Sequence, residues 1–282
     1  MIEVVRPGPL ATVQDLGRPG HAHLGVPRSG AADERSFRLA NRLLGNADDA
    51  AAVELTLGGA AFRFDRAAWI AVTGAPAPLT IGGRAYGANA PCPVPAGGLV
   101  ELGLPSGGLR TYLAVRGGLD IEPVLGSRST DLLSGLGPGP LAAGDRLPVG
   151  RSRGDITVDV APVGPLPAEP VLRILPGPRD DWFTPDVIAV LCAQPYEVTA
   201  DSNRVGVRLD GAKLLRTREG ELGSEGMVTG ALQVPPSGLP IIFLADHPTT
   251  GGYPVVAVLA ASDVPLAAQL RPGGRVRFRP AG

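Results

Sequence analysis

The sequence predicts a mainly β protein with a few short helices, arranged as two domains. Three observations favour this fold class. First, 40 glycines and 30 prolines punctuate short runs rich in Val, Ile and Leu, which is typical of many turns joining many strands. Second, a hydrophobic content of 44% over 282 residues is sufficient for packed cores. Third, the second half of the chain repeats the plan of the first.

The repeat is visible where a Pro- and Gly-rich turn leads into an apolar run. In the first half this run is 99–104, followed by a Pro-Ser-Gly-Gly turn, and in the second half it is 239–244, followed by a polar loop. A duplicated β domain is the simplest explanation, although such turns look alike in any β protein. We predict one β domain over 1–160 and another over 161–282 that carries the polar loop, with the Pro-rich stretch 151–170 as the boundary.

Helices are expected at three places with recognisable boundary signals. The first spans 31–44, with Asp33 as a possible N-cap and Gly45 just past its end. Thr184–Pro185 opens the second, and the third begins at Ser262–Asp263 and stops before the proline at 272. The main strand candidates are 69–73, 99–104, 111–116, 171–175, 205–209, 241–244, 254–260 and 275–279.

Charge and residue content exclude several classes of function. A net charge of −1 provides no broad basic surface, so no nucleic-acid partner is expected. No apolar run reaches the roughly 18 to 20 residues of a membrane span, and the N-terminus has no signal-peptide core, so we expect a cytoplasmic protein without a membrane partner. Cys92 and Cys192 are too few for a thiolate zinc site, and no metal is expected. Lys213, the sole lysine, excludes a P-loop and a biotin-attachment site.

The most concentrated polar chemistry lies in the loop 244–254, between two apolar runs. Asp246 and His247 offer a base and a carboxylate to orient it, and the hydroxyls and glycines that follow offer donors for an oxyanion. A structural role is the alternative for a single histidine. We predict three catalytic residues, Asp246, His247 and Thr250. Candidate substrate contacts in the same loop are Thr249, Gly251, Gly252 and Tyr253.

Other polar clusters provide further candidates for substrate binding. Arg204 or Arg128 could hold a carboxylate or phosphoryl group, while a salt bridge or a turn cap explains each of them equally well. Glu225 could act as a general base, but a role in a turn or a helix cap is slightly favoured. Gln14 and Asp15 are expected to hold a loop in place by hydrogen bonds rather than to bind substrate. The candidates are Ser202, Asn203, Arg204, Arg128, Glu225 and Gln233.

Taken together, these segments resemble the KipA family, whose members form the C component of 5-oxoprolinase and which is related to the carboxyltransferase domain of urea amidolyase. The motifs that carry the resemblance are Thr12 to Gly20, Ser29 to Asp33, Ala40 to Asn46, Glu54 to Thr56, Arg116 to Gly118, Gly126 to Asp131, Pro176 to Asp180, Ser202 to Leu209, Ser224 to Pro236 and Ala245 to Pro254. The resemblance implies two cyclophilin-like β-barrel domains. It also implies a KipI-like partner, the B component of 5-oxoprolinase, with the active site where the chains meet. A separate A component of 5-oxoprolinase phosphorylates the lactam with ATP.

Three functions remain open. In the first, the chain is part of an ATP-dependent 5-oxoprolinase that opens 5-oxoproline to L-glutamate and is inactive or weakly active alone, with His247 moving a proton. This function needs no covalent cofactor, because ATP is used by a partner. In the second, the chain is part of a biotin-dependent carboxyltransferase acting on urea or a similar amide, with biotin on a separate carrier. In the third, it is a non-enzymatic protein that sequesters its KipI-like partner.

Overall fold

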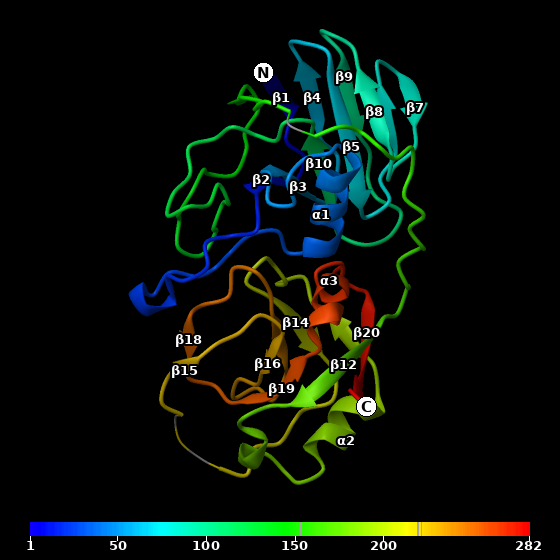
Figure 1. Ribbon diagram of the computed structural model, residues 1–282. Coiled ribbons are helices and arrows are strands. Elements are labelled where there is room, and N and C mark those ends of the chain that lie inside the picture. The colour runs from blue at the N-terminus through cyan, green and yellow to red at the C-terminus, as the bar shows by residue number, and fades with distance from the viewer. Residues whose placement is uncertain (153, 219, 221) are drawn as a thin grey trace. The chain divides into compact units, whose positions relative to one another are not determined.

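The computed structural model describes residues 1–152, 154–218, 220 and 222–282, which divide into two compact units (Figure 1). The first unit comprises Met1–Arg18, Ser29–Asp131 and Gly135–Pro165, and the second comprises Pro19–Arg28, Leu132–Ser134 and Leu166–Gly282. Both are built mainly from strands with a few short helices, which confirms the predicted fold class. None of the helices in the described ranges is long and apolar enough to cross a membrane.

The first unit contains two antiparallel sheets. The six-stranded sheet has the order β11-β1-β4-β9-β6-β7, and the five-stranded sheet has the order β2-β3-β10-β5-β8. The strands are β1 Ile2–Arg6, β2 Leu10–Gln14, β3 Ala52–Thr56, β4 Ala61–Phe64, β5 Ala68–Gly74, β6 Leu79–Ile81, β7 Arg84–Tyr86, β8 Pro91–Val94, β9 Leu99–Leu102, β10 Arg110–Val115 and β11 Arg146–Leu147.

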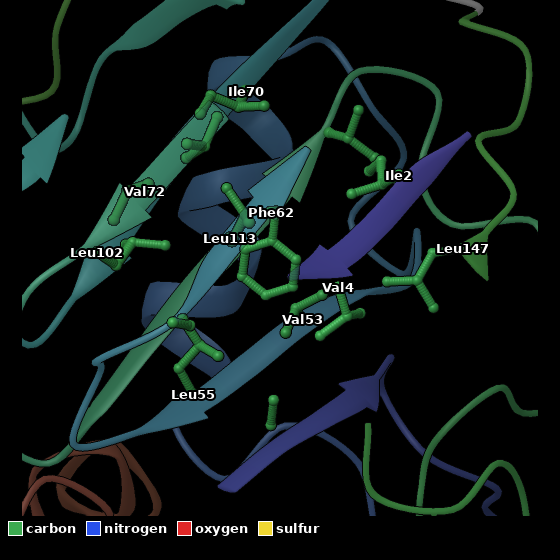
Figure 2. Close-up of a cluster of buried hydrophobic side chains, with 14 of the residues drawn as sticks. Ile2, Val4, Val53, Leu55, Phe62, Ile70, Val72, Leu102, Leu113 and Leu147 are labelled. Atoms are coloured by element: carbon green, nitrogen blue, oxygen red, sulfur yellow. The ribbon is translucent and has the colours of Figure 1, made fainter. Parts of the chain in front are cut away.

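The core of the first unit forms between these two sheets. Figure 2 shows Val4 and Phe62 from the six-stranded sheet beside Val53 and Leu113 from the five-stranded sheet, all in one buried cluster. Because side chains alternate along a strand, the neighbours of Leu113 in β10 face the opposite way. They pack against helix α1, so β10 is buried on both faces.

Helix α1, Glu34–Leu43, follows from its boundary residues. The Asp33 side chain accepts a hydrogen bond of 3.0 Å from the Ser36 amide, so the helix begins three residues later than position 31. Phe37 and Leu43 are buried on the face that meets β10. Gly45, at φ 66°, takes the left-handed conformation that ends the helix.

The second unit is a closed barrel of seven strands in the order β12-β19-β16-β17-β14-β13-β20. The parallel pairing of β12 with β20 closes it, and all other pairings are antiparallel. The strands are β12 Val171–Pro176, β13 Tyr196–Val198, β14 Gly206–Asp210, β16 Ala231–Gln233, β17 Ile241–Phe243, β19 Val255–Leu259 and β20 Arg275–Pro280. The helices of this unit are η1 Ala22–Leu24, η2 Asp180–Trp182, α2 Val187–Ala193, η3 Ala261–Asp263 and α3 Val264–Ala267.

One strand pairing is common to both units. The apolar run of the repeat forms β9 in the first unit and β17 in the second, and these strands pair antiparallel with β4 and β14 respectively. The preceding strands differ, because β8 pairs with β5 whereas β16 pairs with β17 and β19. The duplication therefore stays a prediction.

Candidate functional site

The predicted site loop runs from the end of β17 to the start of β19 in the second unit. Part of it forms strand β18, Thr250–Gly251, which pairs with β15, Glu225–Gly226, as a two-stranded ribbon (Figure 1). The Met227 amide extends the ribbon by donating to the Thr249 carbonyl at 2.9 Å. The fold thus brings Glu225 beside Gly251, which sequence separation alone does not indicate.

Asp246 is fully buried and forms a bidentate ion pair with Arg204. Arg204 Nε lies 2.9 Å from Asp246 Oδ2, and Nη2 lies 3.0 Å from Oδ1. The Leu132 amide donates to the same carboxylate at 3.2 Å. The Asp246 amide in turn donates to the Arg204 carbonyl at 3.1 Å. Arg204 and Asp246 therefore clamp the start of the loop, immediately before His247.

His247 is 7% exposed, and its ring stacks on Phe243 with 5.9 Å between the centroids. Its Nδ1 lies 2.7 Å from the Pro248 carbonyl oxygen. A carbonyl can only accept, so Nδ1 carries the proton and the neutral ring keeps its lone pair on Nε2. Burial lowers the pKa of His247, against the opposing effects of the Pro248 hydrogen bond and the Asp246 charge. A neutral imidazole of this kind can accept a proton.

The rest of the loop is fastened by Gln233, whose Nε2 donates to the Tyr253 carbonyl at 3.1 Å. A Cβ added to Gly251 would lie 2.8 Å from the same Gln233 nitrogen, so a side chain at this position would displace the Gln233 amide. Thr250 is exposed on the ribbon. Gly251 pairs with Glu225, which commits its backbone to the ribbon.

Glu225 is held by Arg179, which lies in the segment Pro176 to Asp180 and was not among the predicted site residues. Arg179 Nε lies 2.9 Å and 3.0 Å from the two carboxylate oxygens, and Nη2 also contacts Oε1. The hydrogen bonds from Arg179 lower the pKa of Glu225. The carboxylate is therefore charged near neutral pH, and a lowered pKa makes it a weaker base.

Ser202 and Asn203 organise the turn that precedes β14. Asn203 Oδ1 accepts from the amides of Val205 at 2.8 Å and Gly206 at 3.3 Å. Ser202 Oγ accepts from the Arg208 amide at 3.0 Å. Both side chains thus accept hydrogen bonds from backbone amides of this turn.

Arg128 belongs to the first unit, unlike all the other predicted site residues. Its backbone amide donates to Asp15 at 2.6 Å, and its Nη2 lies 3.8 Å from Asp120. The hydroxyls of Ser127 and Ser129 also donate to the buried Asp15 carboxylate, each at 2.6 Å. Asp15 thus ties down the 127–129 segment, in keeping with the loop-tying interpretation.

A family model described as carboxyltransferase domain, subdomain A and B, matches residues 24–280. The chain belongs to this family. The matched range contains every residue predicted for the site, from Arg128 to Tyr253.

Relatives of the chain include parts of multi-component enzymes and larger proteins. The chain is 39% identical to the 5-oxoprolinase C component of Escherichia coli K12, with 99% of this chain and 90% of that one covered. The crystal structure of TTHA0988 is 37% identical with a TM-score of 0.91, and the chain covers 55% of that protein. The urea amidolyase of K. lactis is 31% identical with a TM-score of 0.92, and the chain covers 19% of it.

Proposed function

We propose that this chain is a cytoplasmic component of an ATP-dependent 5-oxoprolinase, which opens 5-oxoproline to L-glutamate. The observation that carries the proposal is the end-to-end match to a protein named as the C component of 5-oxoprolinase, which spans 90% of that relative. In this proposal the KipI-like B component completes the site and the separate A component uses ATP. Lys213 is the only lysine, so the chain has no P-loop lysine of its own.

In the proposed reaction, His247 acts as the general base. Its Nε2 takes a proton from the water that attacks the lactam carbonyl carbon. The ring C–N bond then breaks, and the leaving nitrogen takes up a proton to become the amino group of glutamate. The A component transfers the terminal phosphoryl group of ATP to the lactam oxygen beforehand, so ring opening leaves the γ-carboxyl as an acyl phosphate. A second water hydrolyses this acyl phosphate and releases phosphate and the free γ-carboxylate. Because the Gly251 backbone is paired in the ribbon, the Thr250 hydroxyl and the Gly252 amide are the candidates to stabilise the oxyanion.

Arg204 and Asp246 act as positioning residues in this proposal. The Arg204 fork already holds the Asp246 carboxylate through two nitrogens, and the pair is buried. A clamp at the residue before His247 limits the positions its ring can take, which favours proton transfer in one geometry. Neither residue needs to contact the substrate.

The test is reconstitution of the complete complex of three components with His247→Asn in place of the native chain. We expect ATP-dependent glutamate release from 5-oxoproline to fall by about 100-fold or more, as for loss of a general base. Assembly, followed by size-exclusion chromatography, should be unchanged. Near-normal turnover by the variant would reject the assignment of His247.

A biotin-dependent carboxyltransferase is the second candidate. It is favoured by the family model and by the likeness of the whole chain to part of a urea amidolyase. The biotin would sit on a separate carrier, and the loop would polarise the carbamate of carboxybiotin. Carboxyl transfer from a carboxylated biotin carrier to urea, with no glutamate formed from 5-oxoproline, would select this function over the first.

A further inference from the structure

Arg216 lies beside the exposed ring of Tyr253, at the end of the site loop. Its Cζ is 5.7 Å from the centroid of that ring, and its Nη2 donates to the Val234 carbonyl. An antiparallel bridge between Phe183 and Arg216, next to a hydrogen bond of 2.9 Å from the Thr217 amide to the Trp182 carbonyl, holds the backbone in place. The guanidinium is therefore fixed in position.

Arg216 differs from its neighbours Arg179 and Arg218 in having no counter-ion among the residues that the structure describes. Arg179 is paired with Glu225, and Arg218 lies 2.8 Å from Asp181. Within residues 1–152, 154–218, 220 and 222–282, no carboxylate lies within ion-pair distance of Arg216, and its buried Nε has no hydrogen-bond partner there. Burial lowers the pKa of this guanidinium. A half-buried guanidinium is costly when its charge is not neutralised, and its planar fork fits a carboxylate or a phosphate.

We propose that Arg216, stacked on Tyr253, is a carboxylate-binding site of this chain. A planar guanidinium matches a carboxylate well, and cation–π contact with Tyr253 keeps it oriented. The inference rests on the proposed function, whose substrate and product both carry carboxylates. Arg204 and Arg128 were the sequence-based candidates for this role. The Arg204 guanidinium already holds Asp246, and Arg128 Nη2 lies 3.8 Å from Asp120. The same chemistry could come from an acidic side chain of the KipI-like partner.

The experiment compares two ligands in the reconstituted complex. 5-Oxoproline carries a carboxylate, whereas 2-pyrrolidinone is the same lactam without it. Arg216→Met should raise KM for 5-oxoproline at least about tenfold with little change in kcat, as expected for loss of a charged hydrogen bond. Binding of 2-pyrrolidinone, measured by calorimetry, should not change. Arg216→Lys should recover part of the affinity.

Arg218→Met is the matched control. Arg218 also lies over an aromatic ring, with its Cζ 6.0 Å from the centroid of Trp182, but it is already neutralised by Asp181. This variant should leave KM unchanged. Thermal unfolding of all three variants would show that they fold.

The outcomes separate the inference from the proposed function. If KM is unchanged in Arg216→Met but affinity for the KipI-like partner falls tenfold or more, the site holds and the carboxylate belongs to that partner. Unchanged KM together with unchanged partner affinity would overturn the inference while the oxoprolinase function stands. If the native complex forms no glutamate, the proposed function fails, and calorimetric titration of the complex with 5-oxoproline still tests Arg216.

Discussion

At the scale of single residues, adjacency in sequence is a poor guide to pairing. Asp246 precedes His247, and we expected it to orient the imidazole. The structure instead directs the carboxylate to Arg204 and the Leu132 amide, while His247 Nδ1 bonds to Pro248. A buried carboxylate needs hydrogen-bond donors or a positive partner, and a guanidinium supplies both to its two oxygens at once.

Removing one member of this pair should be strongly destabilising. Asp246→Ala leaves the buried Arg204 charge without its main partner, so we expect the free energy of unfolding to fall by about 3–5 kcal/mol in denaturant titrations. The double variant Asp246→Ala with Arg204→Met should recover part of that loss. A loss below about 1 kcal/mol in the single variant would show that the pair does not hold the loop.

His247 should make stability depend on pH. The unfolded chain takes up a proton near the ordinary histidine pKa of about 6.5, while burial lowers the pKa of the native residue. The stabilisation is therefore complete above about pH 6.5 and is lost as pH falls toward the native pKa. Denaturant titrations at several pH values should show this slope, and His247→Gln should reduce it.

At the scale of elements, the β15–β18 ribbon converts a long loop into a braced one. Each strand of the ribbon has only two residues, so the sequence shows no alternation of apolar residues there. The ribbon places Gly251 against Gln233, and Gln233 in turn holds the Tyr253 carbonyl. These contacts connect the C-terminal end of the loop to the barrel strand β16.

Gly251→Ala should disturb the loop through a steric clash. The new Cβ would lie 2.8 Å from Gln233 Nε2, so the side-chain amide of Gln233 must shift. Its hydrogen bond to the Tyr253 carbonyl then weakens. We expect glutamate formation by the complex to fall at least about tenfold, since small misplacements of site groups are costly. Gly226→Ala is the control on the facing strand, because an added Cβ there meets open space. Equal activity of the two variants would argue against the brace.

At the scale of the whole molecule, the two units use their strands differently. The described strands of the first unit form two sheets with a helix on one of them, and those of the second unit close into a barrel. The loop of the predicted site lies in the barrel unit. The corresponding connection of the first unit is the shorter segment 103–109 between β9 and β10. If the predicted duplication is correct, only the second of the two related domains carries the loop of the predicted site.

The chain alone should not open 5-oxoproline. With Lys213 as its sole lysine, it has no P-loop for ATP, and lactam opening in the proposed scheme needs phosphorylation by another component. Glutamate release should appear only when the A and B components are added with ATP. Turnover by this chain alone, after affinity tags and contaminating partners are excluded, would contradict the scheme.

Much of the fold was predictable from local pattern. All eight predicted strand segments overlap strands of the structure, and Asp33 and Gly45 mark the ends of α1 as expected. These features depend on residues close in the chain, such as alternating apolar positions and capping side chains. The shortest strands, including β15 and β18, carry too few residues to show a period.

The sequence by itself determined the strand-rich fold class, the position of α1 and the polar loop around His247, because each follows from neighbouring residues. Only the tertiary structure decided that Arg204 holds Asp246, that Arg179 holds Glu225 and that Arg216 is left without a counter-ion among the described residues. The partners in the two pairs are separated by 42 and 46 positions in the chain. Ion pairing depends on distance and burial in space, and those are set only when the barrel closes.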